Sequence, residues 1–512
     1  MRSMGRALHL SMAVLLTTGA VAPLGAQATA HETKDEFMAR ARAQVEANER
    51  IQPNRNKARN VILFVGDGMG VATITAARIL DGQRRKSPYG GEENVLSFEK
   101  FPYLAHSKTY QANQQVPDSA PTMTAIITGS KANDGMLSIA PNVLGSDDFG
   151  PASDPANHLE SLLERAEKRG MWTGVVSTAR LTHATPGACY AHTPNRDWES
   201  DADLSPGAAA AKFPDIARQL LDFNLRETTM NGVRSRGLEV AMGGGRENFL
   251  SANDTDPEDA GSKGKRKDSR NLAREWEKAG GKYVWNQTGF NAIDPAKTGP
   301  VLGLFERGHM LYEAQRQNEP SLTEMTEKAI RILERSPEGF FLMVEGGRVD
   351  HAHHGGLAYL ALIETIELAR AVERAALMTG DDTLIVVTAD HSHTLTMSGY
   401  PTRGNDIMGL MITNGADGKP LAAPSPATDG KPFTTLGYAN GPGAVSGARP
   451  HATQEEVKAP DYRQQALVPL NSETHGGEDV AIFARGPQAH LFQGTMEQNA
   501  IYWVMAKALG FW

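Results

Sequence analysis

The stretch from Glu345 to His354 constrains the fold of this chain most, because it places carboxylates and imidazoles directly after an apolar run. Residues 339–344 are mostly apolar and predict a short buried strand. Asp350 and His354 stand four residues apart, so on a helical turn they share one face and can bind one ion. Glu345 lies too far back for that group and suits a harder, oxygen-preferring ion nearby. Taken alone, the stretch is equally consistent with a polar loop that caps a helix.

A second cluster of metal-ligand residues follows another predicted strand. Residues 383–388 are apolar and β-branched, and Asp390, His391 and His393 come directly after them. Open α/β sheets bind ligands in the crevice outside the carboxyl ends of their strands. Two such clusters at two strand ends therefore favour a metal site over a capped polar loop.

The periodicity of the other segments predicts an α/β fold, with a doubly wound, mostly parallel central sheet flanked by helices. Further strands are expected at 60–65, 174–177, 238–242 and 480–483, and helices at 35–50, 71–80, 119–129 and 357–378. Asp67 follows the first strand among glycines, which indicates a tight turn and a close approach. The strand at 238–242 ends in the glycine run Gly243–Gly245.

Ser119 stands at the predicted start of a helix that Gly129 closes. A serine in that position is usually a helix cap. The same position gives its hydroxyl free N–H groups and a positive helix end, which suit an oxyanion or a phosphate. Both interpretations stay open at this point.

Residues 1–28 predict a secretory signal peptide, with Arg2 and Arg6 before a mostly apolar run and small residues at 26–28. We expect an exported protein, periplasmic or secreted, without a membrane anchor. Cys189 is the only cysteine, which excludes an internal disulfide. The net charge of −8 argues against nucleic-acid binding, which favours a basic face.

The motifs occur together in an order that resembles the alkaline phosphatase family over roughly residues 57–512. They are Asp67, Ser119, His183 with Thr185, residues 345–354, residues 390–393 and His475. The runs at 345–354 and 473–480 resemble the vertebrate type. The resemblance implies a catalytic domain made of residues 57–397 and 467–512. Residues 29–56 are then an N-terminal helical segment, and residues 398–466, rich in Gly, Pro, Asn and Ala, are an inserted, crown-like rim subdomain.

The resemblance also implies two Zn²⁺ ions, one Mg²⁺ ion and a covalent phosphoserine intermediate. The first zinc ligands would be Asp350, His354 and His475. The second zinc ligands would be Asp67, Asp390 and His391, with Ser119 at the open position. The magnesium ligands would be Asp67, Thr185 and Glu345, with His183 beside them. Phosphate would be bound by Arg196, which Asp118 orients, and by His351.

Ligand chemistry agrees with this assignment. Nitrogen and carboxylate ligands suit zinc, whereas an all-oxygen set suits magnesium. Zinc beside a hydroxyl lowers its pKa, so Ser119 needs no histidine base. Pro121 and Met123 depart from the small residues that the family usually has after the nucleophile. His183 and His351 resemble the vertebrate type, where other bacterial relatives place an Asp and a Lys.

Vertebrate relatives also bind calcium. Phe305 and Glu306 match part of that site, and Glu319 stands in for an Asp, while a further carboxylate finds no counterpart near Gly207. The expected function is hydrolysis of small-molecule phosphate monoesters by a homodimer. The alternatives are a phosphodiesterase or sulfatase of the same superfamily, and a non-enzymatic periplasmic protein that binds zinc or phosphate.

Overall fold

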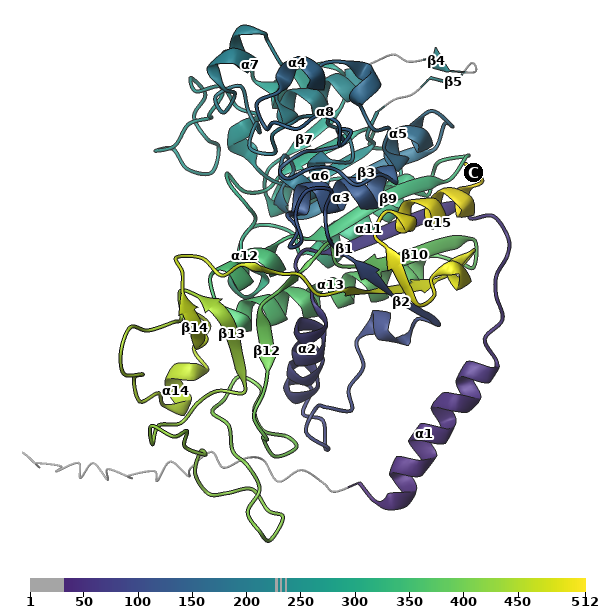
Figure 1. Cartoon of the computed structure of the whole chain (residues 1–512). Coiled ribbons are helices and arrows are strands. Elements are labelled where there is room, and N and C mark those ends of the chain that lie inside the picture. Colours follow the sequence, from purple (N-terminus) through teal and green to yellow (C-terminus); the bar gives the residue numbers. More distant parts are fainter. Residues whose placement is uncertain (1–31, 226–228, 231–232, 235–236) are drawn as a thin grey trace, which may run out of the picture.

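One ten-stranded sheet runs through the centre of the molecule (Figure 1). The computed structural model describes residues 32–512 except 226–228, 231–232 and 235–236. From one edge to the other the strands are β17 (Thr495–Glu497), β2 (Tyr103–Lys108), β16 (Val480–Arg485), β10 (Thr383–Thr388), β1 (Asn60–Gly66), β9 (Phe340–Gly346), β3 (Trp172–Arg180), β6 (Val240–Gly244), β8 (Val301–Leu304) and β7 (Lys282–Val284).

The sheet is mostly parallel, as the sequence predicts. Only β16 runs against its two neighbours, β10 and β2. The central strand β1 lies between β9 and β10, and its register places Val65 beside both Glu345 and Thr388. The residues that follow these three strands therefore meet beyond the carboxyl ends of the strands.

Helices cover both faces of the sheet, which confirms the doubly wound architecture. Every residue of β1 is buried, and alternate side chains enter two different cores. One core contains Ile62 and Phe64, and the helices that bury apolar residues in it include α2 (Val71–Arg84), α11 (Leu322–Leu333) and α13 (Ala358–Met378). The other contains Leu63 and Val65, with α3 (Ser119–Thr128), α5 (Leu162–Glu167), α8 (Ile216–Leu225), α9 (Leu272–Lys278) and α15 (Ala500–Leu509).

Residues 398–466, which we call the rim segment, are mostly irregular. They carry β13 (Leu436–Gly441) and α14 (Gln454–Val457), and β13 pairs with β12 (Leu395–Met397) and β14 (Ala466–Pro469). The rim segment has a small apolar cluster of its own, made of Leu410, Ala452 and Val457 with Tyr462 against it. It lies at the lower left of Figure 1, beside α2.

The remaining elements are short. They are the helices α4 (Phe149–Ala152), α6 (Ala184–Gly187), α7 (Pro206–Ala210), α10 (Gln287–Asn291) and α12 (Arg348–His354), the 3₁₀ turns η1 (Ser97–Lys100), η2 (Pro155–Asn157), η3 (Arg246–Asn248), η4 (Glu313–Gln315) and η5 (Ala489–Leu491), and the two-stranded ribbons β4 (Thr229–Met230) with β5 (Val233–Arg234) and β11 (Ser392–His393) with β15 (His475–Gly476).

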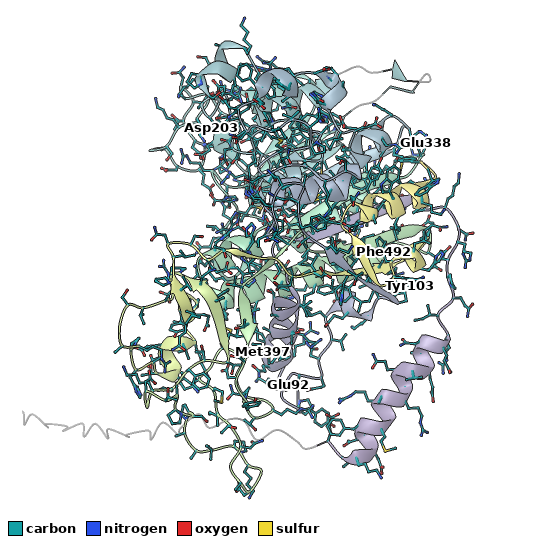
Figure 2. The ribbon with its side chains drawn as sticks, viewed as in Figure 1. Glu92, Tyr103, Asp203, Glu338, Met397 and Phe492 are labelled. Carbon is teal, nitrogen blue, oxygen red and sulfur yellow. The ribbon has the colours of Figure 1, made fainter. Side chains whose placement is uncertain are left out.

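The N-terminal helix α1 (Lys34–Glu49) forms over nearly the range that its sequence predicts, with a Thr33–Glu36 capping box at its start. None of its residues is buried, and Phe37, Met38 and Val45 are largely exposed. Two of its side chains contact the body of the molecule: the Tyr89 hydroxyl lies 3.5 Å from Glu36 Oε1, and the Arg403 guanidinium lies 5.7 Å from the centroid of the Phe37 ring. Figure 2 shows the helix with its side chains. The predicted signal peptide lies outside the described residues. Among the helices that the structure describes, none combines the length and apolarity needed to cross a membrane.

Candidate active site and metal centre

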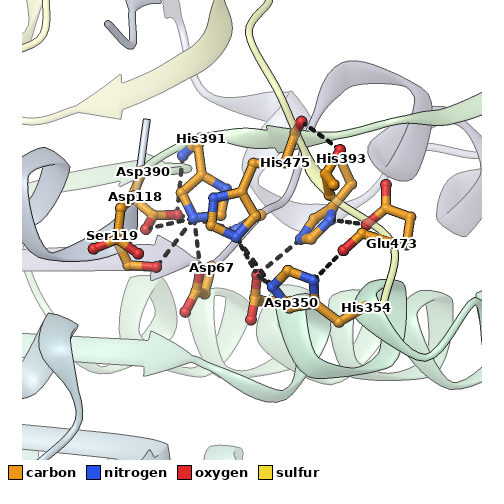
Figure 3. Close-up of polar contacts among 12 residues, drawn as sticks. Asp67, Asp118, Ser119, Asp350, His354, Asp390, His391, His393, Glu473 and His475 are labelled. Atoms are coloured by element: carbon orange, nitrogen blue, oxygen red, sulfur yellow. Dashed lines mark hydrogen bonds and ion pairs between the residues drawn. The ribbon is translucent and has the colours of Figure 1, made fainter. Parts of the chain in front are cut away.

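The predicted ligand residues converge beyond the carboxyl ends of β1, β9 and β10 (Figure 3). Asp67 follows β1, Glu345 is near the end of β9, and Asp390 with His391 follows β10. The stretch after β9 forms the short helix α12, so the predicted spacing of Asp350 and His354 does place them on one helical face.

Asp350, His354 and His475 form the first group. His354 Nε2 and His475 Nε2 each lie 3.3 Å from Asp350 Oδ1 and 3.1 Å from one another. The Nδ1 of His354 donates to the Glu473 carbonyl at 2.6 Å, and that of His475 to the Pro117 carbonyl at 2.7 Å. A neutral imidazole that donates from Nδ1 presents a lone pair at Nε2. Two lone pairs and a carboxylate oxygen facing each other fit a bound cation.

His391, Asp67 and Asp390 form the second group. His391 Nδ1 donates to the Ser392 carbonyl at 3.2 Å, which again leaves Nε2 as an acceptor. That Nε2 lies 3.4 Å from Asp67 Oδ1, 3.3 Å from Asp390 Oδ2 and 3.1 Å from Ser119 Oγ. All three ligand residues are fully buried. This group also fits a cation, with the Ser119 hydroxyl next to it.

Asp67, Glu345 and Thr185 form the third group, in which the facing atoms are mostly oxygens. Within the described structure, neither carboxylate oxygen of Asp67 nor Glu345 Oε1 has a hydrogen-bond partner, although all are buried. Burial, with the charges of Asp390 and Asp350 nearby, raises the pKa of Asp67 well above its usual range and that of Glu345 to about 7. The buried hydroxyl of Thr185 lies beside Glu345. A cation would compensate the charge of these buried carboxylates, and an oxygen set suits a hard one.

Ser119 does not cap its helix, which decides between the two interpretations of that residue. The N-cap of α3 is Asp118, whose carboxylate accepts from the Ala120 backbone N–H at 3.2 Å. Gly129 closes the helix in the left-handed conformation, with φ of 79°. Ser119 is the first helical residue and is 2% exposed. Its hydroxyl is therefore free to face His391. Met123, one of the two residues that depart from the family pattern, lies fully buried in the core.

Arg196 is held at the entrance of the site by three contacts. Its backbone N–H donates to the Gly135 carbonyl at 2.8 Å. One guanidinium nitrogen, Nη1, donates to Asp118, and the other, Nη2, lies 2.8 Å from His183 Nε2. His351 lies beside His183, with ring centroids 5.3 Å apart, and burial lowers its pKa to about 3. The arrangement presents a fixed guanidinium with two uncharged imidazoles next to it.

His393 is a residue of the site that was not assigned a role from the sequence. His393 lies between two carboxylates, with Nε2 2.9 Å from Asp350 Oδ1 and Nδ1 2.5 Å from Glu473 Oε2. Although burial opposes it, these bonds raise the pKa of His393 to about 9. His393 also lies within reach of two of the groups that could hold a metal. Because both of its nitrogens donate to carboxylates, it orients Asp350 instead of coordinating an ion. In the sequence, its position in the 390–393 cluster was the feature that could have indicated a role for His393.

A separate acidic group contains the residues that resemble the vertebrate calcium site. Burial raises the pKa of Glu319 to about 8, and the charges of Glu306 and Glu258 contribute. Burial also raises the pKa of Glu306, and the charge of Glu258 adds a smaller increase. Glu258 is thus a further carboxyl group whose charge acts on both Glu306 and Glu319.

Comparison with known proteins shows the family of this chain. The sequence matches the family model for alkaline phosphatases over residues 58–511. An alkaline phosphatase from Gadus morhua is 47% identical over 468 residues, covering 89% of this chain and 92% of that protein. The tissue-nonspecific isozyme from Homo sapiens is 45% identical over 468 residues, covering 89% and 84%.

Solved structures show the same fold. The alkaline phosphatase of Thermus thermophilus aligns with a TM-score of 0.61 at 22% identity, covering 90% of this chain and 93% of that chain. The enzyme from the Antarctic bacterium TAB5 aligns with a TM-score of 0.59 at 20% identity, covering 89% and 99%. The resemblance seen in the motifs is thereby confirmed, and the chain belongs to the alkaline phosphatase family.

Proposed function

We propose that this protein hydrolyses phosphate monoesters, with Ser119 as the nucleophile. The observation that carries the proposal is the position of the Ser119 hydroxyl, 3.1 Å from His391 Nε2 and beside two buried carboxylates. Attack of Ser119 Oγ on phosphorus forms the phosphoserine and breaks the ester P–O bond, so that the alcohol leaves with a proton. Water then attacks the phosphoserine, releasing inorganic phosphate and restoring the hydroxyl.

The side chains divide the work of binding between them. Arg196 suits two phosphate oxygens at once, because its planar guanidinium is bidentate and Asp118 fixes its orientation. His351 and His183 lie next to it as neutral groups.

The three groups of ligands support two zinc ions and one magnesium ion. Asp350, His354 and His475 would hold the first zinc, and Asp67, Asp390 and His391 the second. Asp67, Thr185 and Glu345 would hold magnesium, with His183 within reach. When bound, these ions would neutralise phosphate charge and lower the pKa of the Ser119 hydroxyl.

Trapping of the phosphoserine tests the proposal. In Ser119→Ala, acid quenching during turnover of a ³²P-labelled monoester should recover no protein-bound phosphate, while zinc and magnesium contents equal those of the wild type. Activity should fall by about a thousandfold or more, and the remaining groups of the site should account for the residual activity. Label retained in the variant would show that Ser119 is not the nucleophile.

Side-by-side rates distinguish the rival reactions. Arg196 and the third ligand group suit a dianionic, fully exposed phosphoryl group, so an aryl phosphate should react far faster than the matching diester or sulfate ester. Faster turnover of either competitor would reassign the substrate class. A protein that only binds zinc or phosphate would turn over none of the three.

A calcium ion at Glu258, Glu306 and Glu319 is a second proposal. Burial and mutual repulsion raise the pKa values of Glu306 and Glu319, and a cation between these carboxylates would remove that cost. Calcium should raise the melting temperature of the wild type, and Glu319→Gln should abolish the increase. An equal increase in the variant would contradict the site.

We also propose that the protein is an exported homodimer. The apolar side chains of α1 have no partner within the described part of the chain that buries them, and a second copy could cover them. Sedimentation of the full mature chain should give a dimer, and removal of residues 32–50 should weaken it. Cleavage after residue 28, read by mass spectrometry of protein from the culture, tests the export.

A further inference from the structure

His309 lies on a loop that two strand ends hold in place. The loop follows β8 and is hydrogen-bonded to the ends of β3 and β6. Met310 donates its N–H to the Thr178 carbonyl at 3.1 Å, and Gly245 donates to the Gly308 carbonyl at 2.6 Å. Hydrogen bonds on both sides of one residue leave it little freedom.

The glycine run after β6 makes room for this loop. A Cβ at Gly244 would lie 2.3 Å from the Gly308 carbonyl oxygen, closer than real contacts allow. Gly245 has φ of +94°, and a Cβ there would lie 3.0 Å from Arg180 Cβ. Glycine is therefore needed at 244 and 245 because the His309 loop and Arg180 pack directly against that backbone.

Arg180 fixes the His309 ring. Its backbone N lies 3.2 Å from His309 Nδ1, and its guanidinium Nη1 lies 2.5 Å from His309 Nε2. A neutral imidazole accepts at only one nitrogen, so Arg180 donates to one of the two. The same guanidinium is anchored by the buried carboxylate of Glu199, with Nε to Oε2 at 2.7 Å. Burial, together with the charges around it, keeps the pKa of His309 far below its usual range. The ring is thus uncharged and rigidly placed.

The His309 ring also contacts two histidines of the phosphate-binding group. Its centroid lies 3.9 Å from that of His351, with the rings tilted, and 5.3 Å from that of His183, edge to face. His183 Nε2 in turn lies 2.8 Å from Arg196 Nη2. Among the described residues, His309 belongs to no group that could hold a metal.

We propose that His309 is a positioning residue for phosphate binding, which holds the rings of His351 and His183 and, through His183, the guanidinium of Arg196. The inference rests on the proposed role of Arg196 as the phosphate clamp. A ring that only filled space would affect stability, whereas this placement makes phosphate affinity depend on His309.

The experiment compares four variants with the wild type. His309→Leu removes the ring, and His309→Phe keeps its packing without the nitrogens. Gly244→Ala displaces the loop without altering any side chain of the site. Arg307→Ala is the matched control, because Arg307 is on the same loop but pairs with Glu247 on the surface. The readouts are kcat and KM for an aryl phosphate, the inhibition constant of inorganic phosphate, metal content and melting temperature.

In His309→Leu, KM and the inhibition constant of phosphate should both rise about tenfold, while kcat changes less than about threefold. His309→Phe should restore phosphate affinity to within about threefold of the wild type. Gly244→Ala should shift both constants in the same direction as His309→Leu, and Arg307→Ala should change neither. Metal content should stay constant in every variant.

Two outcomes would overturn the proposal. The first is phosphate affinity in a folded His309→Leu within twofold of the wild type. The second is a change explained by loss of metal. If His309→Leu does not fold, the other two variants decide. Loss of phosphate affinity in His309→Phe, or unchanged phosphate affinity in Gly244→Ala, contradicts the role of ring packing. Arg196→Ala separates this result from the proposed function: if it leaves phosphate affinity unchanged, the clamp itself is wrong.

Discussion

The metal centre and the rim segment hold their side chains in place by different means. Asp67, Glu345 and Asp390 are fully buried at the ends of strands whose other residues fill two large cores. The rim segment has a small apolar cluster and exposes Tyr400, which is 88% accessible. Its chain is held by turns and by surface ion pairs such as Arg449 with Asp429.

The difference shows where unpaired, buried charge is tolerated. Unpaired carboxylates persist at the metal centre because the surrounding core fixes the backbone that carries them and because an ion can compensate their charge. The rim segment, which the structure describes in full, shares part of the large core through Ile407, Met408, Leu436 and Tyr438, but it carries no unpaired buried carboxylate. It reaches the metal centre through Tyr438, whose hydroxyl lies 2.7 Å from His353 Nδ1. The ring of His353 lies 4.7 Å from that of His393. Substitutions at the metal centre should therefore change chemistry, and substitutions in the rim segment should change little.

His475→Ala should give the largest effect, because it removes one of the three proposed ligands of the first zinc. His475 lies over a hundred residues along the chain from the other two. Turnover should fall by about a hundredfold or more, and the phosphoserine should accumulate because its hydrolysis slows. Zinc content and acid-quenched phosphoenzyme are the measurements. A full zinc complement with normal turnover would show that His475 is not a ligand.

His183→Asp should have a smaller effect that concerns the choice of metal. His183 supplies a nitrogen to the third group, which zinc accepts more readily than magnesium does. Excess zinc should inhibit the wild type, and magnesium should slowly restore it. In the variant, half-inhibition should require about tenfold more zinc, because a carboxylate favours magnesium and its waters. Equal inhibition of both proteins by zinc would remove His183 as the cause.

Glu364→Gln tests the core that supports the metal centre. Burial raises the pKa of Glu364 to about 8 from its ordinary value of 4.5. The folded state thus binds this proton more tightly than the unfolded chain, so stability from Glu364 is fully present below pH 4.5 and is lost as pH rises through 8.

Glutamine cannot ionise, and its carbonyl can still accept the Glu313 N–H that Glu364 accepts at 2.6 Å. Relative to the wild type, the melting temperature of the variant should rise by about 2 °C between mildly acidic and alkaline pH. The control is Glu373→Gln, an exposed site on the same helix. A pH-independent difference for Glu364→Gln would contradict the shift.

Arg449→Ala should have the smallest effect. Arg449 Nη2 and Asp429 Oδ1 lie 2.8 Å apart, and Arg449 also contacts the carbonyls of Pro432 and Lys431, all within the rim segment. Partly exposed ion pairs contribute little, so the melting temperature should fall by less than about 2 °C and kcat/KM should not change. A marked loss of activity would mean that the rim segment supports the metal centre more than its contacts indicate.

Much of the metal centre could be predicted from short-range patterns in the sequence. The four-residue spacing of Asp350 and His354 determines a shared helical face, and apolar runs before Asp67, Glu345 and Asp390 determine that each leaves a buried strand. These features depend on backbone periods that act within a few residues. The strands at 60–65 and 383–388 and the helix at 357–378 accordingly lie where their sequences predict them, within one residue.

Only the tertiary structure decided which strand ends meet and which side chains pair. Asp118, not Ser119, caps α3, because its carboxylate satisfies the Ala120 N–H and leaves the serine hydroxyl for His391. His393 is a donor between Asp350 and Glu473, although its sequence neighbours are predicted ligands.

The physical reason is that partner choice depends on burial summed over the whole core, whereas the entropy of closing a long loop grows only slowly with its length. β1 therefore pairs with β9 and β10 across some three hundred residues of chain at little extra cost, as the register of Val65 with Glu345 and Thr388 shows. His309 illustrates the same limit. Nothing local to it signals a role, and its function depends on Arg180, His351 and a glycine run that the fold brings to it.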